Sequence, residues 1–202
     1  MKNGIAWWLG LLAASLAAGC VNIDVESKAK QFYVLQDTGR SQCQKPPGSG
    51  ALLIDVLTPA AFYNANTLAF SKGAGSRGYY QYAQWTDRPA NQIGLLVRDR
   101  LRQGCLYRQV ALSGEGLTGE QQLSLRLLEL YHDVSSSPGQ AVIELDVQLI
   151  RRDAARLIAQ KTFRVTAPAA GFDAKGAAAG MNQALTRLLD ELAAWLAQQP
   201  RG

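Results

Sequence analysis

The chain has 202 residues, 48% of them hydrophobic and 18% charged, with a formal net charge of +5 at pH 7. This length suits one domain with a hydrophobic core of its own. The basic residues are scattered rather than gathered in a dense block, which argues against nucleic-acid binding because that role needs a concentrated basic stripe.

The N-terminus has the layout of an export signal. Lys2 precedes an apolar stretch at residues 5–18, and small residues then lead to Cys20. A charged start, a short apolar segment and small residues before a cleavage point are typical of a secretory signal peptide. The stretch is shorter than the about 20 residues needed to span a bilayer. Secretion without lipid and a retained anchor helix remain the alternatives.

The run Leu-Ala-Ala-Gly-Cys that ends at Cys20 resembles a bacterial lipobox. Ala17 stands where a lipobox usually has Leu, Val or Ile, and Leu16 lies one position earlier. The resemblance implies that Cys20 becomes the first mature residue and carries diacylglycerol and a further acyl chain such as palmitate. Several acyl chains give an anchoring that one chain cannot.

Val21 follows the cysteine, and in the sorting rule of such lipoproteins an aspartate there retains the protein at the inner membrane. The resemblance therefore implies an outer-membrane lipoprotein that faces the periplasm. We expect a signal peptide at residues 1–19, a lipidated tether at 20–30 and a folded domain at 31–198.

The first part of the expected domain contains short strand-like runs at residues 31–35, 51–57, 68–71 and 79–85. The continuous hydrophobicity of 51–57 predicts a strand buried on both faces. The run at 79–85 is dense in aromatic residues, which favour strands.

A helix is predicted from about Pro89 to Gln103. The residues 86–89 combine side chains that can cap a helix with a proline in the first turn. Apolar residues then recur at helical spacing, and Gly104 is a natural C-cap.

The second half of the chain predicts longer elements. Strands are expected at residues 107–112, 121–134, 141–151 and 157–166, and a final helix, capped by Asp173, runs to Gln198. Alternation along 141–151 indicates a half-buried antiparallel strand. The helix carries an apolar stripe that predicts a core-facing side, made of Met181, Leu185, Leu188, Leu192 and Trp195. We therefore predict one α+β domain: a mainly antiparallel, mixed sheet with two helices on one face.

Besides Cys20 the chain has two cysteines, Cys43 and Cys105. An oxidising compartment makes a disulfide between them the favoured interpretation. Two free thiols are the alternative, since the sequence does not show that their Cα atoms come within bridging range.

The sequence offers little chemistry. His132 is the only histidine, no serine has a recognisable nucleophile context, and no metal-binding or cofactor motif fits. A surface or structural role is expected for His132. Residues 73–78 match a dinucleotide fingerprint, but a strand rather than a helix is expected after them, so they predict a hairpin loop. Glu144 and Asp146 are expected to be solvent-facing acids of a strand. The chain is predicted not to be an enzyme and to need no cofactor.

Several segments resemble the ABC-type transport auxiliary lipoprotein family, which includes the PqiC-like lipoproteins. The most specific segment is the run at 79–89, Tyr-Tyr-Gln-Tyr-Ala-Gln-Trp-Thr-Asp-Arg-Pro, supported by residues 32–35, 106–110 and 188–196. The likeness covers roughly residues 31–198.

The resemblance implies a non-enzymatic component of an intermembrane lipid transporter. Its expected partners are an MCE-domain protein that bridges the periplasm, an inner-membrane permease and an ATPase. Self-association into a homo-oligomer is left open. Tyr80, Tyr82 and Trp85 are the candidate partner contacts, with core packing of the same cluster as the alternative. A structural envelope lipoprotein and a lipid-binding carrier are the competing functions.

Overall fold

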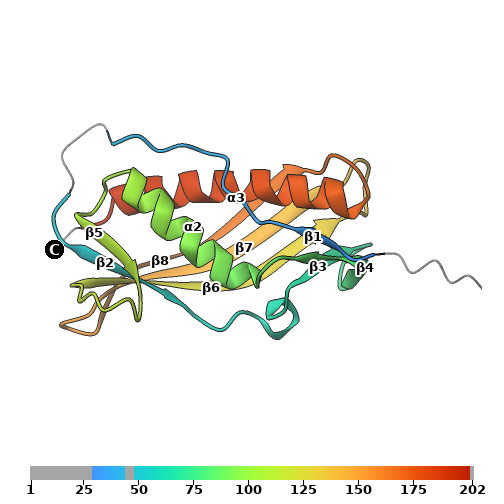
Figure 1. Cartoon of the computed structure of the whole chain (residues 1–202). Helices are drawn as coiled ribbons and strands as arrows, with labels where there is room; N and C mark the ends of the chain where they lie inside the picture. Colours follow the sequence, from blue (N-terminus) through green and yellow to red (C-terminus); the bar gives the residue numbers. More distant parts are fainter. Residues whose placement is uncertain (1–28, 44–47, 201–202) are drawn as a thin grey trace, which may run out of the picture.

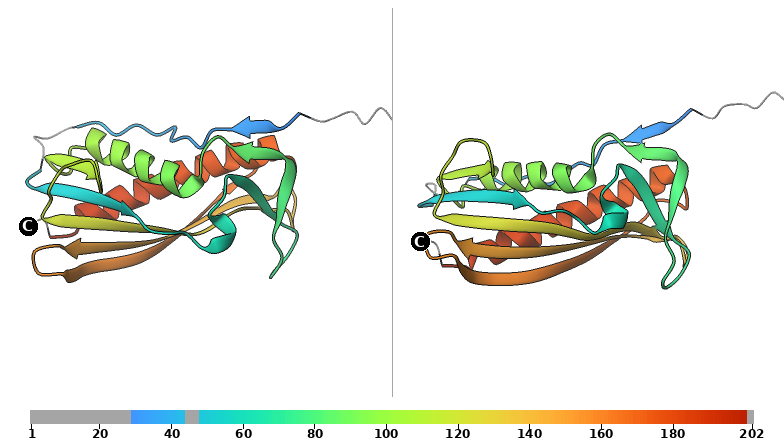
Figure 2. Two further views of the ribbon diagram at one scale, coloured as in Figure 1. Left: turned by 60° about the horizontal axis from the view of Figure 1, so that its bottom comes forward. Right: turned by 90° about the horizontal axis from the view of Figure 1, so that it is seen from below.

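The computed structural model describes residues 29–43 and 48–200. Cys20 and the expected signal peptide lie outside these residues. Within them, an eight-stranded sheet carries two α-helices on one face, which agrees with the predicted α+β class (Figures 1 and 2). The strands are β1 Gln31–Tyr33, β2 Ala51–Val56, β3 Thr67–Ser71, β4 Gly78–Trp85, β5 Gln109–Leu112, β6 Gln121–Asp133, β7 Gln140–Arg151 and β8 Arg156–Pro168. The helices are α2 Pro89–Gln103 and α3 Ala174–Ala197, with a 3-10 turn, η1, at Ala61–Tyr63.

Strand β6 organises the sheet. One of its edges pairs with β7 along almost the whole strand, antiparallel, and β7 pairs with β8 in the same way. Its other edge is shared, because β2 pairs in parallel with the first part of β6 and β3 with its last residues. The remaining order is β1-β4-β3 on one side and β2-β5 on the other. The sheet is therefore mixed, with the longest pairings antiparallel.

The alternation predicted along β7 is confirmed. Ile143, Leu145, Val147 and Leu149 are buried, while the residues between them are partly exposed. The buried row faces α3, which packs over β6, β7 and β8 (Figure 1). Four stripe residues of α3, Met181, Leu185, Leu188 and Leu192, are buried, and Trp195 packs at the margin of the same core. The amphipathic period of α3 thus closes the core.

The ends of α2 differ from the prediction in detail. The N-cap is Arg88, which makes no side-chain capping bond, and Asp87 accepts the Arg88 N–H instead. Proline at the first helical position still sets the start. At the other end Gly104 keeps a right-handed conformation, and the left-handed residue is Cys105, with φ of 53°. The chain turns one residue later because the Cys105 N–H still bonds to the Arg102 carbonyl.

A strap, defined here as residues 34–43, runs from β1 over the helices. Leu35 is buried in the core, and polar bonds fix the backbone on either side of it. The Gln36 N–H donates to Asn182 Oδ1, and the Thr38 N–H donates to Thr186 Oγ1. Gly39 passes so close to the Arg100 guanidinium that a Cβ would overlap it. The strap therefore ties β1 to both helices.

Candidate functional site

One end of the molecule combines the start of the described chain with most of its exposed aromatic side chains. Strand β1 is the outermost strand there and pairs in parallel with β4, Phe32 opposite Gln84. Figure 2 shows β4 curling away from the sheet to lie beside β1. The β3–β4 connection and the loop before α3 lie at the same end (Figure 1).

An aromatic strip runs across this end, and we define it as Phe32, Tyr80, Tyr82 and Phe172. Tyr80 and Tyr82 lie two positions apart on β4, in the stretch where its pairing with β3 shifts register. Phe32 lies on the neighbouring strand β1, opposite Gln84. Phe172 lies in the loop before α3, at the Tyr80 end of the strip. Its backbone carbonyl accepts a hydrogen bond from the Tyr80 hydroxyl at 3.2 Å. The exposed fractions are 57% for Phe32, 44% for Tyr82 and 52% for Phe172.

Trp85, the third contact candidate from the sequence, does not join the strip. It is only 1% exposed, within the main core. The alternative interpretation, core packing, therefore holds for Trp85. Tyr79 also points away from the strip, and its ring stacks on Phe62 with centroids 4.4 Å apart. Whether Tyr80 and Tyr82 touch a partner stays a prediction.

Beneath the strip lies His132, which is fully buried. Its Nδ1 is 2.8 Å from the Tyr80 hydroxyl, and burial lowers the pKa of the imidazole, although Asp133 and Asp173 oppose the shift. Burial also raises the pKa of Tyr80 to about 12, helped by the charge of Asp173. Since the Tyr80 hydroxyl also meets the Phe172 carbonyl, this contact joins β4, β6 and the loop before α3. His132 therefore lies in the interior, which excludes the surface role.

Two surface hollows flank Phe172. The first, of about 430 Å³, is lined by Phe70, Lys72, Tyr80, Val134 and Phe172. The second, of about 630 Å³, is formed by the loop before α3 and its first turn and includes Lys175. Lys72 and Lys175 are exposed, so each hollow adjoins an ammonium group. Lys72 lies over the Phe70 ring, 5.8 Å from its centroid.

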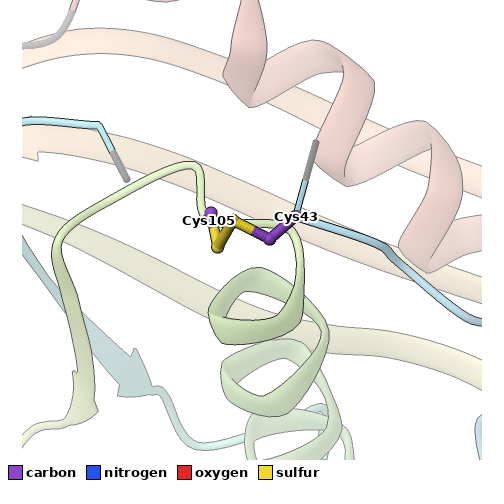
Figure 3. Close-up of a disulfide and its surroundings, with 2 residues drawn as sticks. All are labelled: Cys43 and Cys105. Carbon is purple, nitrogen blue, oxygen red and sulfur yellow. A yellow bond between two sulfur atoms is a disulfide. The ribbon is translucent and has the colours of Figure 1, made fainter. Parts of the chain in front are cut away.

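Cys43 and Cys105 form a disulfide at the opposite end, with Cα atoms 5.2 Å apart. Figure 3 shows the bond joining the end of the strap to the turn after α2. It links segments 62 positions apart in the sequence. The bond therefore holds the far end of the strap, as the polar bonds to α3 hold its middle.

The other polar residues singled out from the sequence are structural. Glu144 pairs with Arg164, and Asp146 accepts bonds from Gln160 and Thr162, so these acids are engaged with the neighbouring strand. The loop at 73–78 connects β3 to β4 and leads into a strand, as expected. Within residues 29–43 and 48–200, no cluster of three or more His, Cys, Asp or Glu side chains could hold a metal ion. Neither described helix is long and apolar enough to cross a bilayer.

Sequence reasoning missed Phe32, Phe172 and Lys72. Phe32 lies in a short strand that the pattern had located, and its alternation with Tyr33 was a usable signal. Phe172 and Lys72 lie in loops, and only the folded arrangement brings them to β4.

The sequence of this chain matches a known protein family. The sequence model of the ABC-type transport auxiliary lipoprotein component matches residues 33–193, from β1 into the last turns of α3. The chain belongs to this family. The aromatic strip, the strap and the disulfide thus all lie in or at the edge of a transport auxiliary lipoprotein domain.

Solved structures share the fold of this family member. A Xanthomonas campestris protein assigned to the family DUF330 is 22% identical, with a TM-score of 0.74, over 82% of this chain and 94% of that one. A hypothetical protein from Chlamydia trachomatis is 12% identical, with a TM-score of 0.52, over 74% of this chain and 96% of its own. At these identities the likeness concerns the fold alone. A search of curated proteins gave no significant match.

Proposed function

We propose that this protein is an outer-membrane lipoprotein, anchored through Cys20 and facing the periplasm, that docks the bridging protein of an MCE-type lipid transporter. The observation that carries the proposal is the family match, which spans nearly the whole folded domain and ends short of the lipobox-like N-terminus. An ABC-type auxiliary component needs a transport complex to serve, and the signal-like start supports export.

A docking role agrees with the arrangement of the described polar side chains. His132 bonds to Tyr80 in the protein interior. The ion pairs among Glu129, Glu144 and Arg164 connect neighbouring strands. Groups placed in this way stabilise a scaffold, and we propose that the protein acts without catalysis. A lipid anchor raises the local concentration of a partner in the same envelope, which suits a docking component.

Affinity purification from native membranes after mild crosslinking tests this function. Wild-type protein is compared with Cys20→Ala, which removes the acylated residue and leaves the domain unchanged. We expect the wild type to fractionate with the outer membrane, to carry the acyl mass in an intact-mass spectrum, and to recover an MCE-domain protein with its permease and ATPase. Cys20→Ala should lose the acyl mass and most of the recovery. An acylated wild type that recovers none of these components contradicts the docking proposal.

A lipid-binding carrier is the main competing function, and the interior argues against it. Leu185 and Leu188 of α3 are fully buried against a sheet face filled by apolar side chains of β6 and β7. Native mass spectrometry of the purified protein separates the two functions, because a carrier retains bound lipid beyond its covalent anchor and a docking component does not. A structural envelope lipoprotein would instead crosslink to the cell wall or to a barrel protein.

A further inference from the structure

We propose that the aromatic strip rests on the outer-membrane leaflet that holds the lipid anchor, with Phe32, Tyr82 and Phe172 at the head-group level and nearby lysines on anionic lipid. This inference rests on the proposed acylation of Cys20. It assigns Tyr82 to lipid rather than to a protein partner, and it fixes which end of the domain faces the bilayer.

The length of the tether sets the distance to the membrane. Eleven chain steps separate Cys20 from Gln31, where β1 begins. A fully extended chain advances at most about 3.6 Å per residue, so β1 lies within about 40 Å of the anchored leaflet. Helix α3, at about 1.5 Å per residue, is about 36 Å long. The reach of the tether is similar to the length of the domain, so it allows the strip end to touch the bilayer but does not alone fix the orientation. The exposed side chains discriminate between the possible surfaces.

Exposed apolar side chains favour the strip. The large hydrophobic residues exposed in the described part of the chain are few: Phe32, Val34, Tyr79, Tyr82, Leu157 and Phe172. Three of them belong to the strip, and Val34 follows β1 directly. Tyr79 is stacked on Phe62 on the other face of β4, and Leu157 lies beside the β7–β8 turn at the opposite end (Figure 2). The end nearest the anchor thus holds most of the large exposed hydrophobic side chains.

The chemistry of the strip suits a lipid head-group region. Aromatic side chains concentrate at membrane interfaces, where an apolar ring and a polar group find matching surroundings. Lys72 and Lys175 adjoin the two hollows beside Phe172, and the exposed Lys30 immediately precedes β1. Basic side chains near the surface are attracted to anionic lipids.

Nearby acids are engaged within the fold. Asp173 accepts the Gly176 N–H as the N-cap of α3, and Asp133 accepts the Ser135 N–H. Asp173 also lines the hollow beside Lys175. Lys72, whose hollow has no carboxylate among its lining residues, is therefore the lysine best placed to meet phosphate. A protein partner on the same surface would need a complementary acidic or apolar face, whereas the bilayer is already within reach of the tether.

Site-specific fluorescence in proteoliposomes tests the orientation. Tyr82→Cys, Phe172→Cys and the control Leu157→Cys each receive one environment-sensitive label, since Cys20 is acylated and Cys43 and Cys105 are bonded to each other. Leu157 is 51% exposed, which matches Phe172 closely. The acylated full-length lipoproteins are reconstituted in vesicles of phosphatidylethanolamine and phosphatidylglycerol that contain a lipid-borne quencher. We expect quenching at 82 and 172 to exceed that at 157 several-fold.

The charge contribution is tested with Lys72→Glu and Lys175→Glu in the Phe172→Cys protein. These exposed substitutions should reduce lipid quenching at position 172 on anionic vesicles, with unchanged melting temperature. Equal quenching at the three positions overturns the proposal. So does shielding of 82 and 172 from a water-soluble quencher without quenching by lipid, because that result shows a protein contact instead. Intact mass and vesicle flotation are measured first, so a missing anchor, which would refute the proposed function, is distinguished from a wrong orientation.

Discussion

Arg100 and Asp37, 63 positions apart in the sequence, form a two-point ion pair beneath the strap. Arg100 Nε donates to Asp37 Oδ2 at 2.8 Å and the neighbouring nitrogen donates to Oδ1 at 2.5 Å. Asp190 of α3 accepts from the same guanidinium, and Thr186 donates to Asp37. Only 2% of the Arg100 side chain is exposed. A buried cation on α2 therefore joins the strap to α3.

Replacing Arg100 by Met should destabilise the domain strongly. The substitution keeps much of the apolar stem but leaves the Asp37 carboxylate without its cation in a largely buried position. Breaking a buried pair from one side costs about 3–5 kcal/mol. Urea unfolding of the purified protein measures the loss. Arg156→Met, at an exposed position of β8, is the control and should stay within about 0.5 kcal/mol of wild type. A loss below the control's range would mean that the ion pair is dispensable.

The Cys43–Cys105 disulfide should contribute independently of that pair. It closes a loop of 62 residues, and chain entropy alone predicts a contribution of about 4 kcal/mol for a loop of this size. Unfolding of the oxidised and reduced wild type should differ by most of this amount. The double variant Cys43→Ser, Cys105→Ser should unfold like the reduced protein and ignore added reductant. Equal midpoints with and without reductant in the wild type would argue against a stabilising bridge.

The single histidine gives the protein a predictable pH dependence. Burial lowers the pKa of His132 in the folded state, whereas the unfolded chain binds a proton near pH 6.5. Well above pH 6.5 the imidazole is neutral in both the folded and the unfolded state, so the free energy of unfolding does not depend on pH through this residue. As the pH falls below 6.5 the unfolded state takes up the proton first, and stability decreases, by at most about 1.4 kcal/mol per pH unit.

Urea unfolding between pH 7.5 and 5 measures this slope. The window lies above the range in which ordinary carboxylates titrate, and the lowered pKa values of Asp133 and Glu115 move those groups further from it. His132→Gln should give a flat profile across the same window, whatever its stability at pH 7.5. A slope that survives in His132→Gln would have to come from another group.

Local patterns predicted the elements whose evidence lies within one stretch of sequence. Strand β7 alternates over its whole length and faces a hairpin partner next to it in the chain, so its edges and buried row were both predicted. Helix α3 combines a capping aspartate with a long apolar stripe. In each case the periodicity and the neighbouring turn are set by adjacent residues.

Local patterns could not predict which strands pair when they lie far apart in the sequence. Strand β6 divides one edge between β2 and β3, which come much earlier in the sequence, and nothing in the three segments names their partner. A register shift between Leu127 and Glu129 also changes the parity of β6 before it reaches His132. The strip shows the same limit, since Phe172 reaches Tyr80 only through the loop before α3.

Gly94 is required where α2 crosses β2, and alanine there should destabilise the domain. A Cβ at this position would overlap Cγ2 of Val56, a stiff β-branched side chain. Alanine in a helix normally gains about 0.8–1 kcal/mol over glycine, but overpacking of this kind costs about 1–3 kcal/mol. Because the overlap is with a stiff side chain, we expect the cost to exceed the gain, with a net loss of up to about 2 kcal/mol in urea unfolding. In a Val56→Ala background the obstructing methyl is absent, so Gly94→Ala should become stabilising. The reversal of sign between the two backgrounds is the decisive measurement, and a loss of equal size in both would show that the Val56 methyl is not the source of the cost.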